Sequence, residues 1–318
     1  MVVELNSAVE FLKERDNFLI LTHTHPDGDT LGSAFALKYA LEAVGKRAEV
    51  KCNDKIPNKF RYLGKACDEE FLFDTLIAVD VADSKLLGKD FEEKYADKVE
   101  LCIDHHGSNR HFAQMTLLEP YAAAACEIIL EIIHSLEVTV GKQIADCIYT
   151  GLSTDTGCFR YSNVTPRTMR MAAEMIECGA DSVTVNTVMF ETKTRTYVAL
   201  EKLAVGGMKM YLDGKCAFIT VTQEMYRQSG SDESEVDAIS SLPRQIEGVL
   251  VGVTMRERPD GSYKVSMRSN RPINVAEICA EMGGGGHPQA AGCQVEGTLE
   301  AATQTVLKNV ENYLLKNS

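Results

Sequence analysis

The stretch FLILTHTHPDGDT, residues 18–30, decides the fold. Its first five residues, Phe18–Thr22, form a short apolar run that is typical of a buried strand in a parallel sheet. A polar loop follows, and a helical pattern then runs from Thr30 to Val44, with Thr30 as the predicted N-cap. Because a strand, a loop and a helix make up the repeating unit of an α/β domain, we expect the unit to recur along the chain.

Further apolar runs of strand length and helical patterns do alternate through the first half. They predict a doubly wound α/β domain with a mainly parallel sheet. The predicted strands are Arg47–Cys52, Thr75–Val81 and Val99–Ile103, and the predicted helices are Tyr121–Leu136, Lys142–Leu152 and Pro166–Cys178.

The pattern changes after about residue 190. Asp213-Gly214 and Pro259-Asp260-Gly261 are turn signals between pairs of apolar runs, and each predicts a hairpin. Hairpins mixed with helices predict a smaller α/β domain with a mixed sheet. The predicted domains are 1–188 and 206–318, joined by a connector helix at 189–205. The predicted strands are Met208–Leu212, Cys216–Val221, Leu250–Arg256 and Tyr263–Arg268, and the predicted helices are Asn274–Glu281 and Leu299–Leu315.

Length and composition suit a soluble two-domain protein. The chain has 318 residues, of which 45% are apolar and 25% charged. No run of eighteen apolar residues occurs, and the N-terminus lacks the features of a signal peptide, so we expect a cytoplasmic protein without a membrane segment. A homodimer is compatible with the sequence.

The net charge of −13 bears on the partners. Long or duplex nucleic acid is held by neutralising many phosphates, which requires a basic face. An acidic chain can still bind a small anion, because bound divalent cations reverse the local field. The charge therefore favours a short nucleotide over long nucleic acid.

Four polar clusters follow predicted elements of the first domain. In open α/β sheets, ligands bind at the carboxyl ends of the strands. The clusters are His23-Thr-His-Pro-Asp27-Gly-Asp29, Asp80, Asp104-His105-His106 and Thr154-Asp155-Thr156-Gly157. Taken singly, the first could be a helix-capping turn, and the second and fourth could be ordinary turns. The paired histidines favour a site, with Asp104 able to orient a ring.

Together the clusters supply enough ligands for two divalent metals that share one carboxylate. Carboxylates with imidazoles suit Mn²⁺, Mg²⁺ or Zn²⁺. Paired metals clamp the attacking and leaving oxygens of a phosphoryl displacement. The predicted ligands are His23, Asp27, Asp29, Asp80, His105 and Asp155.

The four motifs in this order resemble the DHH phosphoesterase superfamily, named after the triplet found here as Asp104-His105-His106. In the second half, Val265–Asn270 and Gly283–Gly292 resemble the associated substrate domain, DHHA1. The resemblance implies that one metal binds His23, Asp27 and Asp80. It implies that the other binds Asp29, Asp80, His105 and Asp155, with Mn²⁺ favoured and Mg²⁺ or Co²⁺ as alternatives.

The resemblance also implies roles around the metals. Asp80 would bridge them, Asp104 would support the catalytic group, and His106 would face the scissile phosphate. Substrate contacts are implied for Asn109 and Arg110 in the first domain and, in the second, for Arg268, Ser269, Asn270, Gly284, Gly285, Gly286 and His287. Without the resemblance, the glycine run would be predicted as a flexible loop.

Within the superfamily, Ile103–Phe112 is similar to the group of nano-RNases and phosphatases of 3′-phosphoadenosine-5′-phosphate (pAp). This implies hydrolysis of short oligoribonucleotides or linear dinucleotides to 5′-mononucleotides, and of pAp to AMP. Lys85 and Ala113 depart from the group, where arginine and glycine are common, which leaves substrate preference open. Three alternatives stay open: a pyrophosphatase or exopolyphosphatase, a RecJ-like exonuclease, and an inactive nucleotide-binding regulator.

Overall fold

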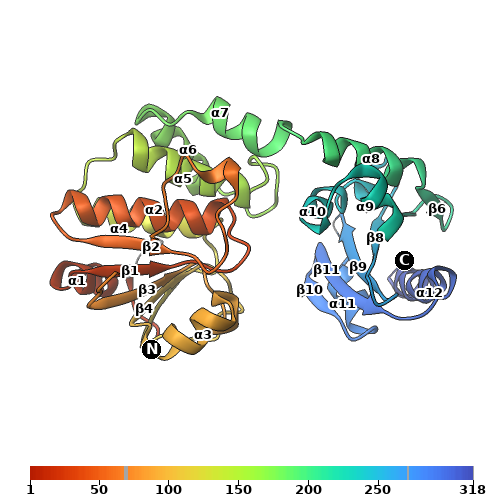
Figure 1. Cartoon of the computed structure of the whole chain (residues 1–318), viewed down its shortest axis with the longest axis horizontal. Coiled ribbons are helices and arrows are strands. Elements are labelled where there is room, and N and C mark those ends of the chain that lie inside the picture. The colour runs from red at the N-terminus through yellow and green to blue at the C-terminus, as the bar shows by residue number, and fades with distance from the viewer. Residues whose placement is uncertain (68–70, 271, 318) are drawn as a thin grey trace. The chain divides into compact units, whose positions relative to one another are not determined.

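The computed structural model describes the chain except residues 68–70, 271 and 318. It divides into two compact units, Met1–Thr192 (the first unit) and Lys193–Ser318 (the second unit). The first contains a five-stranded sheet and the second a six-stranded sheet (Figure 1). This confirms the predicted fold class, a parallel-sheet domain followed by a smaller domain with a mixed sheet. The domain boundaries at residues 188 and 206 stay predictions.

All five strands of the first sheet are parallel, in the order β2-β1-β3-β4-β5. The elements of this unit are α1 (Leu5–Glu14), β1 (Phe18–Leu21), α2 (Gly28–Ala43), β2 (Ala48–Lys51), β3 (Thr75–Val79), α3 (Lys89–Tyr95), β4 (Leu101–Asp104), β5 (Met115–Leu118), α4 (Ala125–Ser135), α5 (Lys142–Asp155), α6 (Pro166–Glu177) and α7 (Ser182–Asn186).

Both faces of this sheet are covered, which explains the uninterrupted apolar runs of β1 and β3. One face lies against α1, α2 and α4, with α5 packed on α2 and α4, and the other face lies against α3 (Figure 1). Helices α2 and α5 pack unusually closely. A side chain at Gly32 would overlap the carbonyl oxygen of Cys147 on α5, so small residues set the spacing of these helices.

Some predicted element limits were wrong. Helix α2 begins at Gly28 rather than Thr30, and its N-cap is Asp27, whose carboxylate accepts from the N–H groups of Asp29 and Thr30. Helix α4 begins at Ala125 rather than Tyr121, because residues 119–122 form a turn. Elements α1, α3, β5 and α7 of this unit were not predicted.

The second unit holds a sheet in the order β10-β11-β9-β8-β7-β6. Both predicted hairpins are confirmed, since β6 pairs with β7 and β8 with β9 in antiparallel fashion, while β7 and β8 are parallel. The glycine run also contributes a short strand, β10. The elements are α8 (Arg195–Gly206), β6 (Lys209–Tyr211), β7 (Cys216–Val221), α9 (Gln223–Ser229), α10 (Val236–Ile239), β8 (Val251–Glu257), β9 (Tyr263–Ser269), α11 (Val275–Ala280), β10 (Gly285–His287), β11 (Ala290–Val295) and α12 (Leu299–Lys316).

Candidate metal centre

Three of the predicted ligands, His23, Asp27 and Asp80, lie together at the carboxyl ends of β1 and β3. His23 follows β1, and Asp27 caps α2 on the same loop. The Nε2 atom of His23 lies 3.8 Å from an Asp27 oxygen and 3.6 Å from an oxygen of Asp80. The nearest ligand atoms of the three residues lie within 4.8 Å of one another, a spacing that one metal ion can bridge. A side chain at Gly28 would overlap Thr154, so this tight loop needs glycine there.

Asp80 is the central residue of the cluster. It directly follows β3, is 3% exposed, and has a left-handed backbone conformation with φ of 59°. Aspartate tolerates this conformation better than most residues, and such strain is concentrated at functional sites. Its backbone N–H donates to the carbonyl of Ile103, which fastens it to β4. The side chain thereby faces the histidines of two different loops.

A second group of possible ligands lies beside the first. The Nε2 atom of His105 is 3.7 Å from Asp29, 3.6 Å from Asp80 and 3.3 Å from Asp155. Asp29, His105 and Asp155 also have ligand atoms within 4.8 Å of one another. Asp155, a predicted ligand, is the last residue of α5, whose predicted end was Leu152, so it belongs to the helix rather than to a turn after it. All six predicted ligands therefore meet at one edge of the sheet.

The two histidines present the nitrogen that a metal requires. The Nδ1 atom of His23 lies 2.7 Å from the carbonyl of Thr24, and that of His105 lies 3.1 Å from the carbonyl of Ala122. A carbonyl only accepts, so each Nδ1 carries the ring proton and each Nε2 has its lone pair free. Such a partner on the far side of the ring fixes the tautomer of metal-binding histidines.

Asp29 is held by backbone groups that the sequence did not reveal. Its carboxylate is fully buried and accepts from the N–H groups of Ala125, at 2.6 Å, and Cys126, at 3.0 Å. These are the first N–H groups of α4, where unpaired donors favour an anion. The opposite side is closed by Gly151 on α5, where a methyl group would lie 2.6 Å from Asp29.

The electrostatics of the cluster favour cations. Burial raises the pKa of Asp80 well above its ordinary value, and the charges of Asp29 and Asp27 raise it further. Burial and the same two neighbours also raise the pKa of Asp155. Asp80 Oδ1 and His105 Nε2 are buried atoms without a hydrogen-bond partner. Buried acceptors that lack donors and repel one another fit the binding of divalent metal ions.

We predict that Asp80→Asn stabilises the metal-free protein, and does so more at pH 8 than at pH 5. Because the folded-state pKa of Asp80 is raised, the folded state binds more protons than the unfolded state between the ordinary carboxyl pKa and the raised one. The free energy of unfolding contributed by this group therefore falls as pH rises through that window. Melting in EDTA should show a gain of about 2–4 °C at pH 8 and a smaller gain at pH 5. Equal gains at both pH values would contradict the assignment.

His106 is oriented differently from His105. Its Nδ1 atom lies 2.8 Å from Asp104 Oδ1, and also 3.4 Å from Asp80. The shorter contact to Asp104 occupies Nδ1, so we do not count His106 as a metal ligand, although its position would allow it. The hydrogen bond to Asp104 raises the pKa of His106. Burial works against ionisation of Asp104, yet hydrogen bonds from His106 and Asn109 hold its pKa below the ordinary value.

The structure separates Asn109 and Arg110, which had been predicted to share a role. Arg110 is exposed, and its backbone N–H donates to Ala82. Asn109 is only 7% exposed, and its amide donates 2.6 Å to Asp104. Its side chain therefore faces the interior.

In the second unit, Arg268 and His287 lie in one row of the sheet. Both are register partners of Ala290, Arg268 on β9 and His287 on β10. Residues directly opposite each other in an antiparallel sheet point to the same face, so these two side chains flank Ala290 on that face. His287 is exposed. This row forms a candidate anion-binding surface within the second unit.

The neighbouring predicted residues differ in exposure. Ser269 is 2% exposed and its hydroxyl donates to the carbonyl of Ile273, which fastens the loop after β9. The exposed Asn270 donates to the carbonyl of Arg244. Gly286, in the middle of β10, has φ of 145°, and a side chain there would lie 2.6 Å from the Ala290 carbonyl oxygen, so only glycine suits this position. Gly284 packs against β11, where a side chain would overlap the Gly292 carbonyl oxygen, whereas Gly285 is exposed with nothing within 4 Å of an added side chain.

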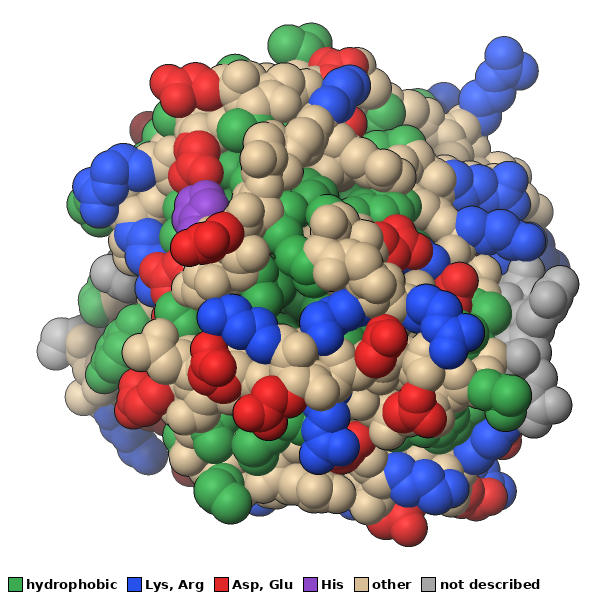
Figure 2. Space-filling model, turned by 90° about the vertical axis from the view of Figure 1, so that its left-hand side faces the viewer, with side chains coloured by type: hydrophobic (Ala, Val, Ile, Leu, Met, Phe, Trp, Pro, Cys, Tyr) green, Lys and Arg blue, Asp and Glu red, His purple; other side chains and the backbone are tan. Residues whose placement is uncertain are grey.

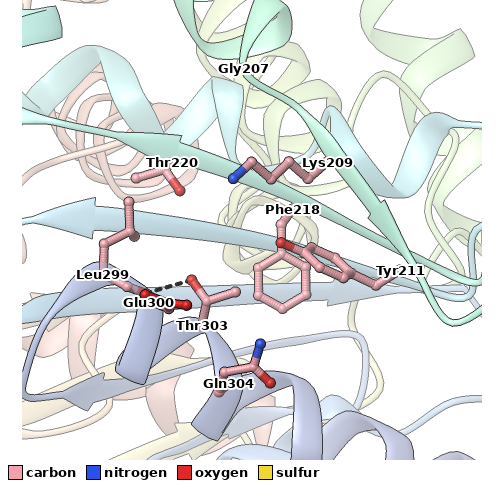
Figure 3. A pocket seen from close by; sticks show the side chains of 9 residues that line it. All are labelled: Gly207, Lys209, Tyr211, Phe218, Thr220, Leu299, Glu300, Thr303 and Gln304. Carbon is pink, nitrogen blue, oxygen red and sulfur yellow. Dashed lines mark hydrogen bonds between the residues drawn. The ribbon is translucent and has the colours of Figure 1, made fainter.

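A cavity of about 400 Å³ lies elsewhere in the second unit, between strands β6 and β7 and the first turns of α12 (Figure 3). Its lining contains Lys209, Tyr211 and Phe218 from the sheet and Glu300 and Gln304 from the helix. No residue of the predicted site lines it. The candidate site is therefore defined by its side chains rather than by this cavity.

Comparison with known proteins identifies the domains. Residues 17–152 match the model of the DHH family, N-terminal domain, and residues 214–316 match that of the DHHA1 domain. Along 99% of its length the chain is 32% identical to the bifunctional oligoribonuclease and PAP phosphatase NrnA of Thermus thermophilus, covering 94% of that protein. The protein of the same name from Mycoplasma genitalium is 28% identical, with 91% of each chain covered.

A solved structure shows the same fold. An exopolyphosphatase-related protein from Bacteroides fragilis superposes with a TM-score of 0.89 at 24% identity, covering 98% of this chain and 97% of the other. Among the described residues, no helix is both long and apolar enough to cross a membrane. Since both domain models match and a relative above 30% identity spans nearly the whole chain, the protein belongs to the DHH family, with a DHHA1 domain in its second unit.

Proposed function

We propose that the protein is a two-metal phosphoesterase that hydrolyses short oligoribonucleotides or linear dinucleotides to 5′-mononucleotides, and pAp to AMP. One observation carries the proposal: two groups of ligands share a single edge of the sheet, with Asp80 between them. The relatives named oligoribonuclease and PAP phosphatase support the substrate class.

The proposed metal assignment follows the distances. One ion would be held by His23, Asp27 and Asp80, with His23 offering Nε2. The other would be held by Asp29, Asp80, His105 and Asp155, with His105 offering Nε2. Asp80 would bridge the ions, because its two oxygens face different histidines. When bound, two such cations supply an activated water and neutralise charge on a phosphate.

The protein's own groups complete the proposed mechanism. Asp104 accepts the Nδ1–H of His106 and raises the pKa of the ring, so the ring protonated on both nitrogens would point its Nε2–H outward and give that proton to a departing oxygen. The exposed Arg110 lies on the same loop as His106, and it is the proposed phosphate ligand of that loop. In the second unit, Arg268, His287 and the backbone at Gly284–Gly286 would bind the far end of the substrate. Asn270 is a further proposed contact, while the buried Ser269 would support this loop.

Charge supports a short substrate. Acidic and basic side chains intermingle on the one face drawn in Figure 2. With a net charge of −13, a long strand would find few cations to neutralise its phosphates. Mn²⁺ as the preferred metal, action in the cytoplasm and a homodimer remain part of the proposal.

A substrate panel tests the proposal. The panel contains pAp, linear di- and trinucleotides, a cyclic dinucleotide, a 24-mer RNA and pyrophosphate, each with Mn²⁺ and with Mg²⁺. We expect metal-dependent release of 5′-mononucleotides from the short RNAs and of AMP from pAp. Hydrolysis of pyrophosphate alone would replace the proposal with a pyrophosphatase, and no turnover of any member would reject it.

We predict a higher kcat/KM for di- to pentanucleotides than for the 24-mer. In a chain of net negative charge, the additional phosphates of a longer strand find few basic side chains and are repelled at long range. For the same reason, raising salt from 50 to 200 mM should change turnover of the short RNAs by less than about tenfold. Time courses on a labelled length series at the two salt concentrations measure both effects. Processive degradation of the 24-mer with a steep salt dependence would contradict this prediction.

A further inference from the structure

We infer that Asn109 is a positioning residue for His106, acting through Asp104, rather than a phosphate ligand. The inference rests on the proposed function, since it assigns His106 a role at the departing oxygen. Asn109 is only 7% exposed, whereas the next residue on the same loop, Arg110, is open to solvent.

The direction of the Asn109 amide is determined by its two neighbours. Its Oδ1 atom accepts from the backbone N–H of His111 at 2.7 Å, and an N–H can only donate. The Nδ2 group must then be the atom that lies 2.6 Å from Asp104 Oδ2, and it also approaches the carbonyl of Val81 at 3.3 Å. Asn109 therefore donates to Asp104, and a flipped amide would break both contacts.

Asp104 links Asn109 to the ring of His106. It is fully buried, and while Oδ2 accepts from Asn109, Oδ1 accepts from the backbone N–H groups of His105, at 2.8 Å, and His106, at 3.2 Å. The same Oδ1 lies 2.8 Å from Nδ1 of the His106 ring. Because each oxygen is engaged, the carboxylate cannot rotate without losing a partner. The ring of His106 is thereby held with Nδ1 inward and Nε2 outward.

This arrangement needs both a donor and an acceptor at position 109. An aspartate there has the same shape and can still accept from the N–H of His111, so the turn is kept. In its ionised form it cannot donate to Asp104, and it places a second carboxylate against the first. Asn109→Asp therefore separates a role in holding the turn from a role in positioning His106.

Kinetics with two leaving groups test the inference. With Mn²⁺, Asn109→Asp should lower kcat on a dinucleotide by about ten- to a hundredfold, the scale of one hydrogen bond to a charged group. KM and bound Mn²⁺ should stay near wild type. On a nucleoside p-nitrophenyl phosphate the loss should be under about threefold, because p-nitrophenolate leaves without proton donation. An Asn109→Asp protein with wild-type kcat on the dinucleotide, or with equal losses on both substrates, overturns the inference.

The imidazole proton of His106 gives a readout independent of turnover. A downfield proton NMR signal, identified by its loss in His106→Ala, should also be lost or shifted in Asn109→Asp; an unchanged signal overturns the inference. Wild-type protein inactive on both substrates would reject the proposed function alone.

The control is Asn186→Asp, whose amide likewise donates to Tyr149 and accepts from Ser153, and it should keep kcat. If Asn109→Asp does not fold, Asn109→Ser, which adds no charge, should show the same preference for the activated ester.

Discussion

Asp80→Asn should lower kcat by at least about a thousandfold while leaving the protein folded. The substitution keeps the shape of the side chain but removes the charge that both proposed metal groups share. Losing the ions removes the nucleophile and the charge neutralisation at once, so the effect exceeds that of losing one hydrogen bond. Metal analysis after gel filtration should show fewer bound Mn²⁺ ions per chain than in the wild type.

Asp83→Asn is the matched control for this experiment. Asp83 lies on the same loop, where its side chain accepts from the N–H of Lys85 and caps a short helical turn. Asparagine is an equally good cap, so activity and metal content should stay within about twofold of the wild type. A folded Asp80→Asn protein that keeps a tenth of wild-type kcat under saturating Mn²⁺ would show that the shared-carboxylate assignment is wrong.

The sequence predicted that the six candidate ligands lie close together, because each ligand motif is short, lies near one end of an element, and recurs along the first unit. Each predicted ligand lies at or near one end of a regular element, and the ends of parallel strands meet at one edge of a sheet. The apolar runs of β1 and β3 were long enough to recognise. Strand β5 was missed because its four residues follow a polar loop without a distinct pattern.

The supports of the site could not be predicted, because they are backbone groups brought together from distant segments. Residues 119–122 form a turn instead of the predicted first turn of α4, which leaves the carbonyl of Ala122 free to meet His105. The later start of α4 then places the N–H group of Ala125 against Asp29. No side chain in this segment signals either contact. The helix start was therefore misplaced at the point where it serves the site.

The role of Asn109 was also beyond the sequence. Its place between the two histidines and Arg110 suggests a phosphate contact as readily as an internal one. Only the burial of the amide, and the His111 N–H that sets its direction, separates the two possibilities. Gly151 did carry a signal, since a glycine inside a helix often marks a close approach, but the sequence could not identify what approaches it.

We predict that Gly151→Ala impairs the metal centre although Gly151 is no ligand. A methyl group at this position would overlap the sulfur of Cys126 and lie 2.6 Å from Asp29 Oδ1. Cys126 is fully buried, and its own N–H is one of the two backbone donors that hold Asp29. Relief of the overlap must therefore move Asp29, its donors or both. We expect kcat to fall by about a hundredfold or more, with loss of about one Mn²⁺ per chain and a cost in stability of about 1–3 kcal/mol.

The double variant Gly151→Ala/Cys126→Ala separates the two contacts of that methyl group. Removing the sulfur relieves its overlap, so most of the lost stability should return. The methyl group still presses on Asp29, so the defect in metal binding should persist. Gly141→Ala, at the N-cap of the same helix, is the control, since nothing lies within 4 Å of its added methyl group, and it should keep wild-type kcat. Thermal melting and metal analysis of the four proteins test this prediction. Full occupancy by Mn²⁺ in Gly151→Ala would show that Asp29 tolerates the displacement, and that the close packing of α2 and α5 serves stability alone.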